Sequence, residues 1–301
     1  MRNTVDGLVV KPFVKWAGGK TQILDPIRLK YPAGLGQSIT KYAEPFVGGG
    51  AVLFDLLRHY HFEQVYISDI NRELICAYQT IRDDVETLVA RLSEIERRYL
   101  PAKERVRKEL YYLNRDRFNS LKAANDTSVE LTALFLFLNR TCFNGLYRVN
   151  SKGAFNVPQG RYKNPGICDA DNLRAVAGVL QNVRIVCGDF RAADPFIDQN
   201  TFVYFDPPYR PLTGSSSFTA YARDGFSDHE QIALAQFINR LSERGAYVVA
   251  SNSDPKNADQ ADNFFDDLYA RQKVFRVSAS RAINAKGNKR GKINELLIAS
   301  N

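Results

Sequence analysis

The amino-acid sequence predicts an α/β protein whose doubly wound, mostly parallel sheet is interrupted by a helical and β-hairpin insertion. Between residues 42 and 69 the pattern changes from strand to glycine turn, helix and second strand. A charged helical block without strand signals follows, up to about residue 125. Strands and helices alternate again after Ile167, so the outer parts of the chain complete one sheet. We therefore expect a main domain in two parts and one inserted domain, which are residues 1–71 with 172–301, and residues 72–171.

The first strand–helix–strand unit carries a glycine turn. Gly48-Gly49-Gly50 follows a short strand at Tyr42-Ala43 and precedes a helix expected from about Ala51 to Tyr60, where apolar residues recur on one face. Glycine lacks the Cβ atom that would keep a ligand away from the backbone. The next strand, Val65–Ser68, ends at Asp69, whose carboxylate can accept hydrogen bonds from ribose hydroxyls. A nicotinamide site or a purely structural turn has the same pattern, so a second motif must decide.

The expected insertion contains a strongly apolar segment and a basic hairpin. The apolar segment covers residues 131–138. Two β-like runs follow and meet at Ser151-Lys152-Gly153, which suits a hairpin tip. Four basic side chains belong to this region, namely Arg148, Lys152, Arg161 and Lys163. Together with the net charge of +8, they favour a polyanionic partner, although many basic proteins bind no nucleic acid.

The last part of the chain resumes the alternation of strands and helices. Helices are expected near residues 172–180 and 229–244 because apolar side chains recur there with helical spacing. Short apolar runs predict five strands, at residues 183–187, 202–205, 247–250, 274–277 and 295–299.

Composition excludes several classes of protein. In 301 residues there are four cysteines, far apart and without a CxxC pair, and three histidines, so the chain has poor material for a zinc site and we expect no metal. No apolar run approaches the length that spans a bilayer, and the N-terminus has no apolar signal core. We therefore expect a cytoplasmic protein.

The deciding motif is the tetrapeptide Asp206-Pro207-Pro208-Tyr209. It directly follows the strand at 202–205 and therefore lies at the carboxyl edge of the sheet, where open α/β folds bind ligands. A conjugated amine is a poor nucleophile because its lone pair is delocalised into the ring, and fixed acceptors for its hydrogens free that lone pair. Asp206 offers a carboxylate, and Pro207 offers a carbonyl held by the stiff Pro-Pro segment. Tyr209 offers a face on which a flipped-out base can stack.

With four further segments, this tetrapeptide makes the chain resemble the Dam-like family (D12 class, alpha group) of DNA N6-adenine methyltransferases, including GATC-type modification enzymes. The segments are FVKWAGGK at 13–20, EPFVGGG at 44–50, FNGLYR at 143–148 and NVPQGRY at 156–162. The resemblance covers nearly the whole chain. It implies a Rossmann-like fold with an inserted DNA-recognition domain, and methyl transfer from S-adenosylmethionine to adenine N6 in double-stranded DNA, within GATC.

The resemblance also implies roles for individual residues. The residues that would contact S-adenosylmethionine are Trp16, Lys20, Phe46, Gly48, Gly50, Asp69, Asp189, Phe190 and Asp206. The residues that would contact DNA are Lys15, Asn144, Leu146, Arg148, Pro158 and Tyr162. Trp16 supplies apolar surface, and Lys20 can pair with the methionine carboxylate of the cofactor. The basic tract at 286–292 is a further candidate for phosphate contacts.

Three alternatives remain at the level of sequence. The same amine-polarising turn suits an amino-methyltransferase that acts on RNA or on a protein glutamine. A nucleic-acid-binding protein can also keep the fold without catalysis. A nicotinamide-dependent dehydrogenase would explain Gly48 and Asp69 but not the segment from Asp206 to Tyr209. We expect a monomer, and the sequence leaves open whether the enzyme serves restriction, mismatch repair or a phage.

Overall fold

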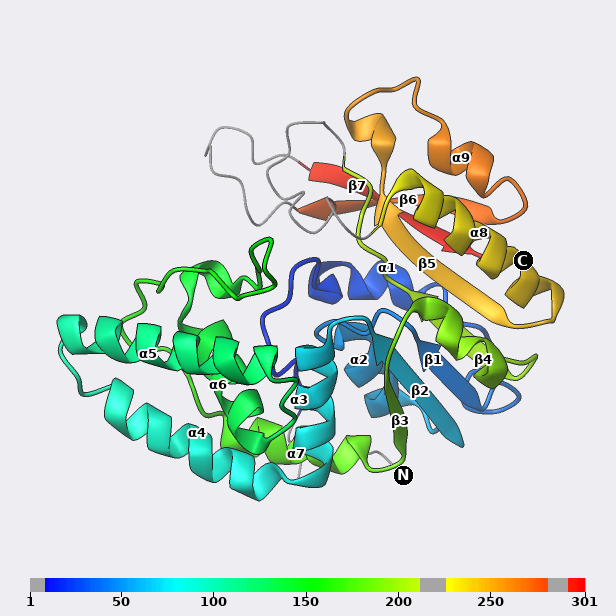
Figure 1. Cartoon of the computed structure of the whole chain (residues 1–301). Helices are drawn as coiled ribbons and strands as arrows, with labels where there is room; N and C mark the ends of the chain where they lie inside the picture. The colour runs from blue at the N-terminus through cyan, green and yellow to red at the C-terminus, as the bar shows by residue number, and fades with distance from the viewer. Residues whose placement is uncertain (1–8, 212–225, 281–291, 301) are drawn as a thin grey trace. The chain divides into compact units, whose positions relative to one another are not determined.

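The computed structural model describes residues 9–211, 226–280 and 292–300 (Figure 1). Of the basic tract at 286–292, only Lys292 lies within the described residues. The chain forms two compact units. The first unit consists of Met1–Gly19, Gly48–His59 and Asp69–Gly188, and the second of Lys20–Val47, Tyr60–Ser68 and Asp189–Asn301.

The second unit is built on a sheet whose strands have the order β2-β1-β4-β5-β7-β6. The strands are β1 (Lys41–Glu44), β2 (Gln64–Asp69), β4 (Thr201–Phe205), β5 (Tyr247–Ser253), β6 (Lys273–Ser280) and β7 (Lys292–Ala299). Strands β2, β1, β4 and β5 are parallel, whereas β7 runs antiparallel to both β5 and β6. The mostly parallel α/β sheet predicted from the sequence is therefore confirmed.

The loops after β1 and β4 leave the sheet at the point where the strand order reverses. From β1 the chain continues to β2 on one side, and from β4 it continues to β5 on the other. Such a switch point is where open α/β sheets bind ligands. Every residue of β4 is buried, as expected for a central parallel strand. The helical segments of this unit are η1 (Lys20–Ile23), α1 (Leu24–Arg28), η3 (Phe190–Phe196), α8 (Asp228–Glu243), η4 (Pro255–Asn257) and α9 (Phe264–Leu268).

The first unit is mainly helical. Its elements are α2 (Ala51–His59), α3 (Arg72–Asp83), α4 (Val85–Tyr99), α5 (Glu104–Ala123), α6 (Val129–Thr141), η2 (Phe143–Gly145), α7 (Ala170–Leu180) and β3 (Val183–Cys187). The apolar segment 131–138 forms the middle of α6, and every one of its residues is buried because α3, α4 and α5 pack around it (Figure 1). A helix that is apolar all round is typical of such a central position.

The hairpin expected around residues 151–153 is present as a tight turn, but its flanking runs do not form strands. One bridge joins Val149 to Phe155, and the Asn150 N–H group donates to the Ala154 carbonyl at 2.9 Å. On the other side of this bridge the Asn156 N–H group donates to the Arg148 carbonyl at 3.1 Å, and the described residues of the two runs form no further bridge. The Phe155 N–H group donates to Asn119 Oδ1 at 2.8 Å, and Asn119 Nδ2 donates back to the Phe155 carbonyl at 3.0 Å.

The strands at the carboxyl end of the chain are longer than the sequence suggested. β5 continues from Tyr247 through the polar residues 251–253, which pair with β7 in register Ser251↔Leu297. Polar residues at the end of an apolar run do not look like a strand in the sequence, although here they are buried. No helix within the described ranges is long and apolar enough to cross a membrane.

Candidate functional site

The carboxylate of Asp206, directly after β4 in the second unit, is held through one of its two oxygens. Lys20 Nζ lies 2.6 Å from Asp206 Oδ1, and Ser251 Oγ donates to the same oxygen at 2.9 Å. No described residue donates a hydrogen bond to Oδ2, and the Asp206 side chain is 20% exposed. Burial raises the pKa of Asp206, while Lys20 and Ser251 oppose that rise. The site thus presents one carboxylate oxygen to a ligand.

Tyr209 provides an aromatic ring in the same unit. Its hydroxyl donates to Glu295 Oε2 at 2.8 Å, and Lys20 Nζ lies 4.6 Å from its ring centroid. Burial raises the pKa of Tyr209 well above its usual value, so the hydroxyl stays protonated. The hydrogen bond to Glu295 therefore fixes the position of the hydroxyl end of the side chain.

The backbone around the Asp206-to-Tyr209 segment is clamped by two buried amides. Gln231 Nε2 donates to the Pro208 carbonyl at 3.1 Å, and the Arg210 N–H group donates to Asn252 Oδ1 at 3.2 Å. Asn252 Nδ2 also donates to Gln231 Oε1 at 3.0 Å, so the two amides support each other. Both side chains are almost completely buried, and a satisfied polar network of this kind is rigid. The loop that carries Pro207 is therefore held in place on its carboxyl side.

Phe46, Asp189 and Phe190 lie near the loops that follow β1 and β3. The rings of Phe46 and Phe190 are stacked, with centroids 5.6 Å apart, and Phe226 meets both edge-on. Phe190 is buried, whereas Phe46 keeps partial exposure. The exposed carboxylate of Asp189 caps η3 and pairs with Arg191 at 3.0 Å. Phe190 thus anchors the core, and Phe46 and Asp189 keep surface for a ligand.

In the first unit, the glycine turn is tied to Asp69. The Gly48 N–H group donates to Asp69 Oδ2 at 3.1 Å, and Tyr78 Oη donates to the Gly48 carbonyl at 3.1 Å. Gly48 has a φ of 49°, and a Cβ atom there would lie 2.9 Å from the ring of Trp16. At Gly50, with a φ of 75°, a Cβ atom would lie 2.6 Å from the Tyr78 hydroxyl. Only glycine fits these two positions without strain.

The two segments predicted to contact DNA lie side by side in the first unit. Cys142 and Gln159 form a β-bridge, and the Phe143 N–H group donates to the Pro158 carbonyl at 2.9 Å. The side chain of Arg148 is exposed, and its Nε donates to Asn156 Oδ1 at 2.8 Å. The remaining predicted residues of these segments keep at least partial exposure, namely Asn144, Leu146 and Pro158.

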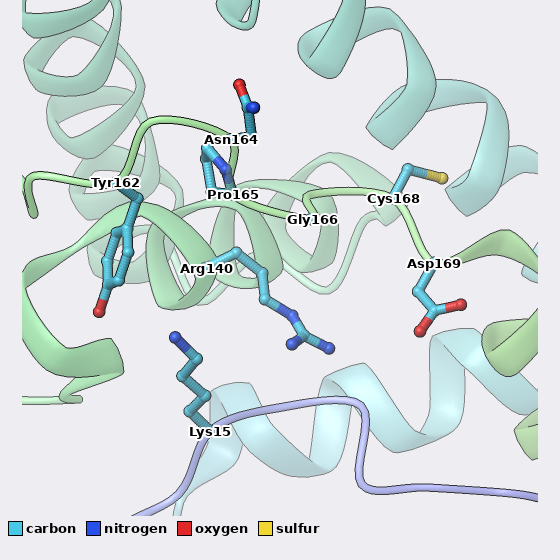
Figure 2. A pocket seen from close by; sticks show the side chains of 8 residues that line it. All are labelled: Lys15, Arg140, Tyr162, Asn164, Pro165, Gly166, Cys168 and Asp169. Atoms are coloured by element: carbon cyan, nitrogen blue, oxygen red, sulfur yellow. The ribbon is translucent and has the colours of Figure 1, made fainter.

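A basic pocket of about 410 Å³ lies next to these segments. Figure 2 shows Lys15 and Tyr162 pointing toward one another on one side, with Arg140 and Asp169 on the other. Lys15 Nζ lies 4.6 Å from the ring centroid of Tyr162. Arg140 Nη2 donates to the Phe13 carbonyl at 2.8 Å, and burial lowers the pKa of this guanidinium. Two cations that line one pocket suit an anionic ligand.

Comparison with known proteins decides the family. The family model described as D12 class N6 adenine-specific DNA methyltransferase matches residues 16–283. The chain belongs to this family. It is 52% identical over 291 residues to the Type II methyltransferase M.MjaIII of Methanocaldococcus jannaschii, covering 96% of this chain and 98% of that protein. It is 35% identical over 288 residues to the DNA adenine methylase of Haemophilus influenzae, covering 95% and 92%, and 34% identical over 287 residues to that of Escherichia coli (strain K12), covering 95% and 94%.

The protein is therefore a DNA adenine methyltransferase, as the sequence predicted. The alternatives of an RNA or protein methyltransferase and of a dehydrogenase are not favoured. The enzyme requires a methyl donor. In the described part of the methyltransferase, no three His, Cys, Asp or Glu side chains gather into a group that would hold a metal ion.

Further residues of the methyltransferase site carry little or no signal in the sequence. Ile70, directly after Asp69, is 75% exposed, although it is a large apolar residue. Its signal in the sequence is an apolar residue next to a strand-ending acid. Arg140 lies in the last turn of α6 between the buried residues Asn139 and Thr141, where a charge is unexpected. Asn252 and Gln231 had no signal, because their roles depend on contacts between segments distant in the sequence.

Proposed function

We propose that the enzyme transfers a methyl group from S-adenosylmethionine to N6 of the adenine within GATC in double-stranded DNA. The observation that carries this proposal is the hydrogen bonding of the two carboxylate oxygens of Asp206. One oxygen of the carboxylate is held by Lys20 and Ser251, and the other meets no donor among the described residues. An amine hydrogen needs such a fixed and accessible acceptor.

In this proposal, the chain positions the adenine amine and raises its nucleophilicity. Asp206 Oδ2 and the Pro207 carbonyl accept the two N6 hydrogens, so the nitrogen lone pair is directed out of the ring. The ring of Tyr209 stacks on the base after the base leaves the duplex. S-adenosylmethionine, when bound, supplies the electrophilic methyl group. The extra proton of the product leaves to solvent, so Asp206 polarises the amine and is not required as a strong base.

The donors and apolar surfaces of the chain fit S-adenosylmethionine. In the first unit, the Asp69 carboxylate suits the ribose hydroxyls, and the exposed side chain of Ile70 beside it suits the flat face of an adenine. Trp16 offers further apolar surface there. In the second unit, Lys20 suits the methionine carboxylate. These assignments are supported by the chemistry of the residues and by the family to which the enzyme belongs.

The cofactor assignment predicts a specific effect of Ile70→Ser. This change should weaken binding of S-adenosylmethionine by about tenfold, because it removes apolar area that the cofactor would cover. Isothermal titration with S-adenosylmethionine measures the effect. The matched control is Leu29→Ser, because Leu29 is an apolar residue that is 82% exposed and has no proposed role. Equal affinities of the Ile70→Ser variant and the parent would contradict the assignment.

The remaining expectations are also proposals. We assign DNA recognition to residues 72–171, all of which belong to the first unit. The exposed basic side chains and the pocket beside Lys15 and Arg140 support this assignment. We further propose that the enzyme acts as a monomer in the cytoplasm, where DNA and S-adenosylmethionine are both available.

The GATC proposal is tested through Arg148. Its guanidinium is exposed and oriented by Asn156, so its remaining N–H groups can meet guanine O6 and N7. Arg148→Ala should cost roughly 1–3 kcal/mol of discrimination at one guanine-bearing position, which is about a 5- to 150-fold loss of preference. The measurement compares methylation rates of GATC duplexes and of their single-base variants at one salt concentration.

Arg161→Ala is the matched control for Arg148→Ala, because it removes the same charge from an exposed residue nearby. We expect it to change the rates of all duplexes alike, which is the effect of losing long-range attraction to phosphates. If Arg148→Ala behaves in the same way, Arg148 does not read a base. A parent enzyme that prefers an unrelated adenine context would refute GATC and leave the adenine assignment intact.

A further inference from the structure

A chain of hydrogen bonds leads from the interior of the second unit to Asp206. The Tyr204 hydroxyl donates to Ser251 Oγ at 3.1 Å, and Ser251 Oγ donates to Asp206 Oδ1 at 2.9 Å. Tyr204 is completely buried and Ser251 is 1% exposed. Burial raises the pKa of Tyr204 well above its usual value, so Tyr204 remains a donor throughout the working pH range. Because Tyr204 occupies a lone pair of Ser251, the single hydroxyl hydrogen of Ser251 is directed at Asp206.

Ser251 and Lys20 reach the same oxygen of Asp206 from different elements. Ser251 lies in β5 and Lys20 in η1, yet both meet Oδ1. Rotation of the carboxylate would break at least one of these charge-assisted hydrogen bonds. Oδ2, which receives no donor from the described residues, therefore has a defined direction.

The two donors differ in rigidity. Lys20 has a flexible four-carbon side chain, and in the proposed function its ammonium also serves the carboxylate of the cofactor. Ser251 has a short side chain on a central strand, and its hydroxyl is already held by Tyr204. Ser251 is thus the donor whose position does not depend on the cofactor.

We propose that Ser251, oriented by Tyr204, is a positioning residue that turns Oδ2 of Asp206 toward the adenine amine. This inference rests on the proposed role of Asp206 in methyl transfer. Ser251 does not touch the substrate and acts only through the carboxylate. Its loss should therefore slow the transfer step without changing affinity for DNA.

The test compares Ser251→Ala and Tyr204→Phe with the parent. Single-turnover rates are measured with a GATC duplex and saturating S-adenosylmethionine, from about pH 5 to about pH 9. Ser251→Ala should lower the plateau rate by about tenfold and leave the KM for DNA unchanged. Tyr204→Phe keeps the buried ring and should give a smaller fall, because the Ser251 hydroxyl then loses its orientation but not its hydrogen.

The pH profile separates positioning from a general loss of structure. A hydrogen bond to the ionised carboxylate favours that form, so removing it raises the pKa of Asp206 further. The acid limb of the profile should therefore move to higher pH in Ser251→Ala, and by less in Tyr204→Phe. Ser242→Ala is the control, because the Ser242 hydroxyl donates to the Ile238 carbonyl in α8 and has no part in the site. Thermal unfolding of all four proteins monitors stability.

Two results would overturn the inference. One is a Ser251→Ala rate within about twofold of the parent with an unmoved acid limb. The other is a fall in rate that follows lost stability in Ser251→Ala while Tyr204→Phe matches the parent in rate and profile. In both cases the parent still forms N6-methyladenine, so the proposed function stands. A parent that forms no N6-methyladenine would overturn the proposed function, and the inference with it.

Discussion

Asp206→Ala should lower the turnover of methyl transfer by about a thousandfold or more, because it removes the acceptor that polarises the adenine amine. The same change removes the Asp206 carboxylate from its ion pair with Lys20, whose side chain is 5% exposed. Breaking one side of a buried pair costs on the order of 3 kcal/mol of stability. Turnover must therefore be measured together with the free energy of unfolding.

A double variant separates the chemical effect of Asp206 from its structural effect. In Lys20→Met with Asp206→Ala, both members of the pair are apolar, so stability should recover, while turnover should stay well below that of Lys20→Met alone. Asp198→Ala serves as the control, since Asp198 pairs with Lys41 at 2.8 Å in the same unit and has no proposed catalytic role. Turnover of Asp206→Ala within about tenfold of the parent would remove Asp206 from the mechanism.

Tyr209→Ala should lower turnover by roughly ten- to a hundredfold, because a flipped base loses the ring on which it stacks. Tyr209→Phe keeps the ring and should retain most of the activity. Tyr209→Phe loses the hydrogen bond from the hydroxyl to Glu295, and in the proposed function that bond does not involve the substrate. Turnover is measured with duplexes that carry adenine at the target position.

A second measurement on the same variants reports the base itself. In duplexes with 2-aminopurine at the target position, unstacking raises the fluorescence. Tyr209→Phe should change this signal little relative to the parent, while Tyr209→Ala should alter it because the extruded base has lost its platform. If Tyr209→Ala matches the parent in both turnover and fluorescence, the stacking role is wrong.

The family match explains which chemistry the enzyme performs, and the structure explains why its central tetrapeptide is held so firmly. The clamp formed by Asn252 and Gln231 contacts the backbone on both sides of Tyr209, at Pro208 and at Arg210. A clamp of this kind lets a short loop present a carboxylate and a carbonyl with little reorganisation during the reaction. In the proposed function, methyl transfer therefore also depends on Asn252 and Gln231, which hold the loop and not the adenine.

The sequence by itself determined the elements with a strong local pattern. The strand at 183–187 and the helix after the glycine turn were predicted almost to the residue, because apolar periodicity is a local property of the chain. The tetrapeptide at Asp206 and the acid at Asp69 were found because each directly follows an apolar strand. In open α/β folds, ligands bind at the edge of the sheet where such strands end. With the four further segments at 13–20, 44–50, 143–148 and 156–162, the tetrapeptide was enough to show the resemblance to the family.

Only the tertiary structure decided how these features are completed. The runs around the hairpin pair through a single bridge, and the backbone of Phe155 is bound instead by Asn119, which lies more than thirty residues earlier in the chain. Lys20 and Ser251 both bind Oδ1 of Asp206 and leave Oδ2 without a donor among the described residues. Both are far from Asp206, and from each other, in the sequence. The physical reason is that hydrogen bonds and ion pairs depend on distance in space, whereas periodicity reports only on neighbours along the chain.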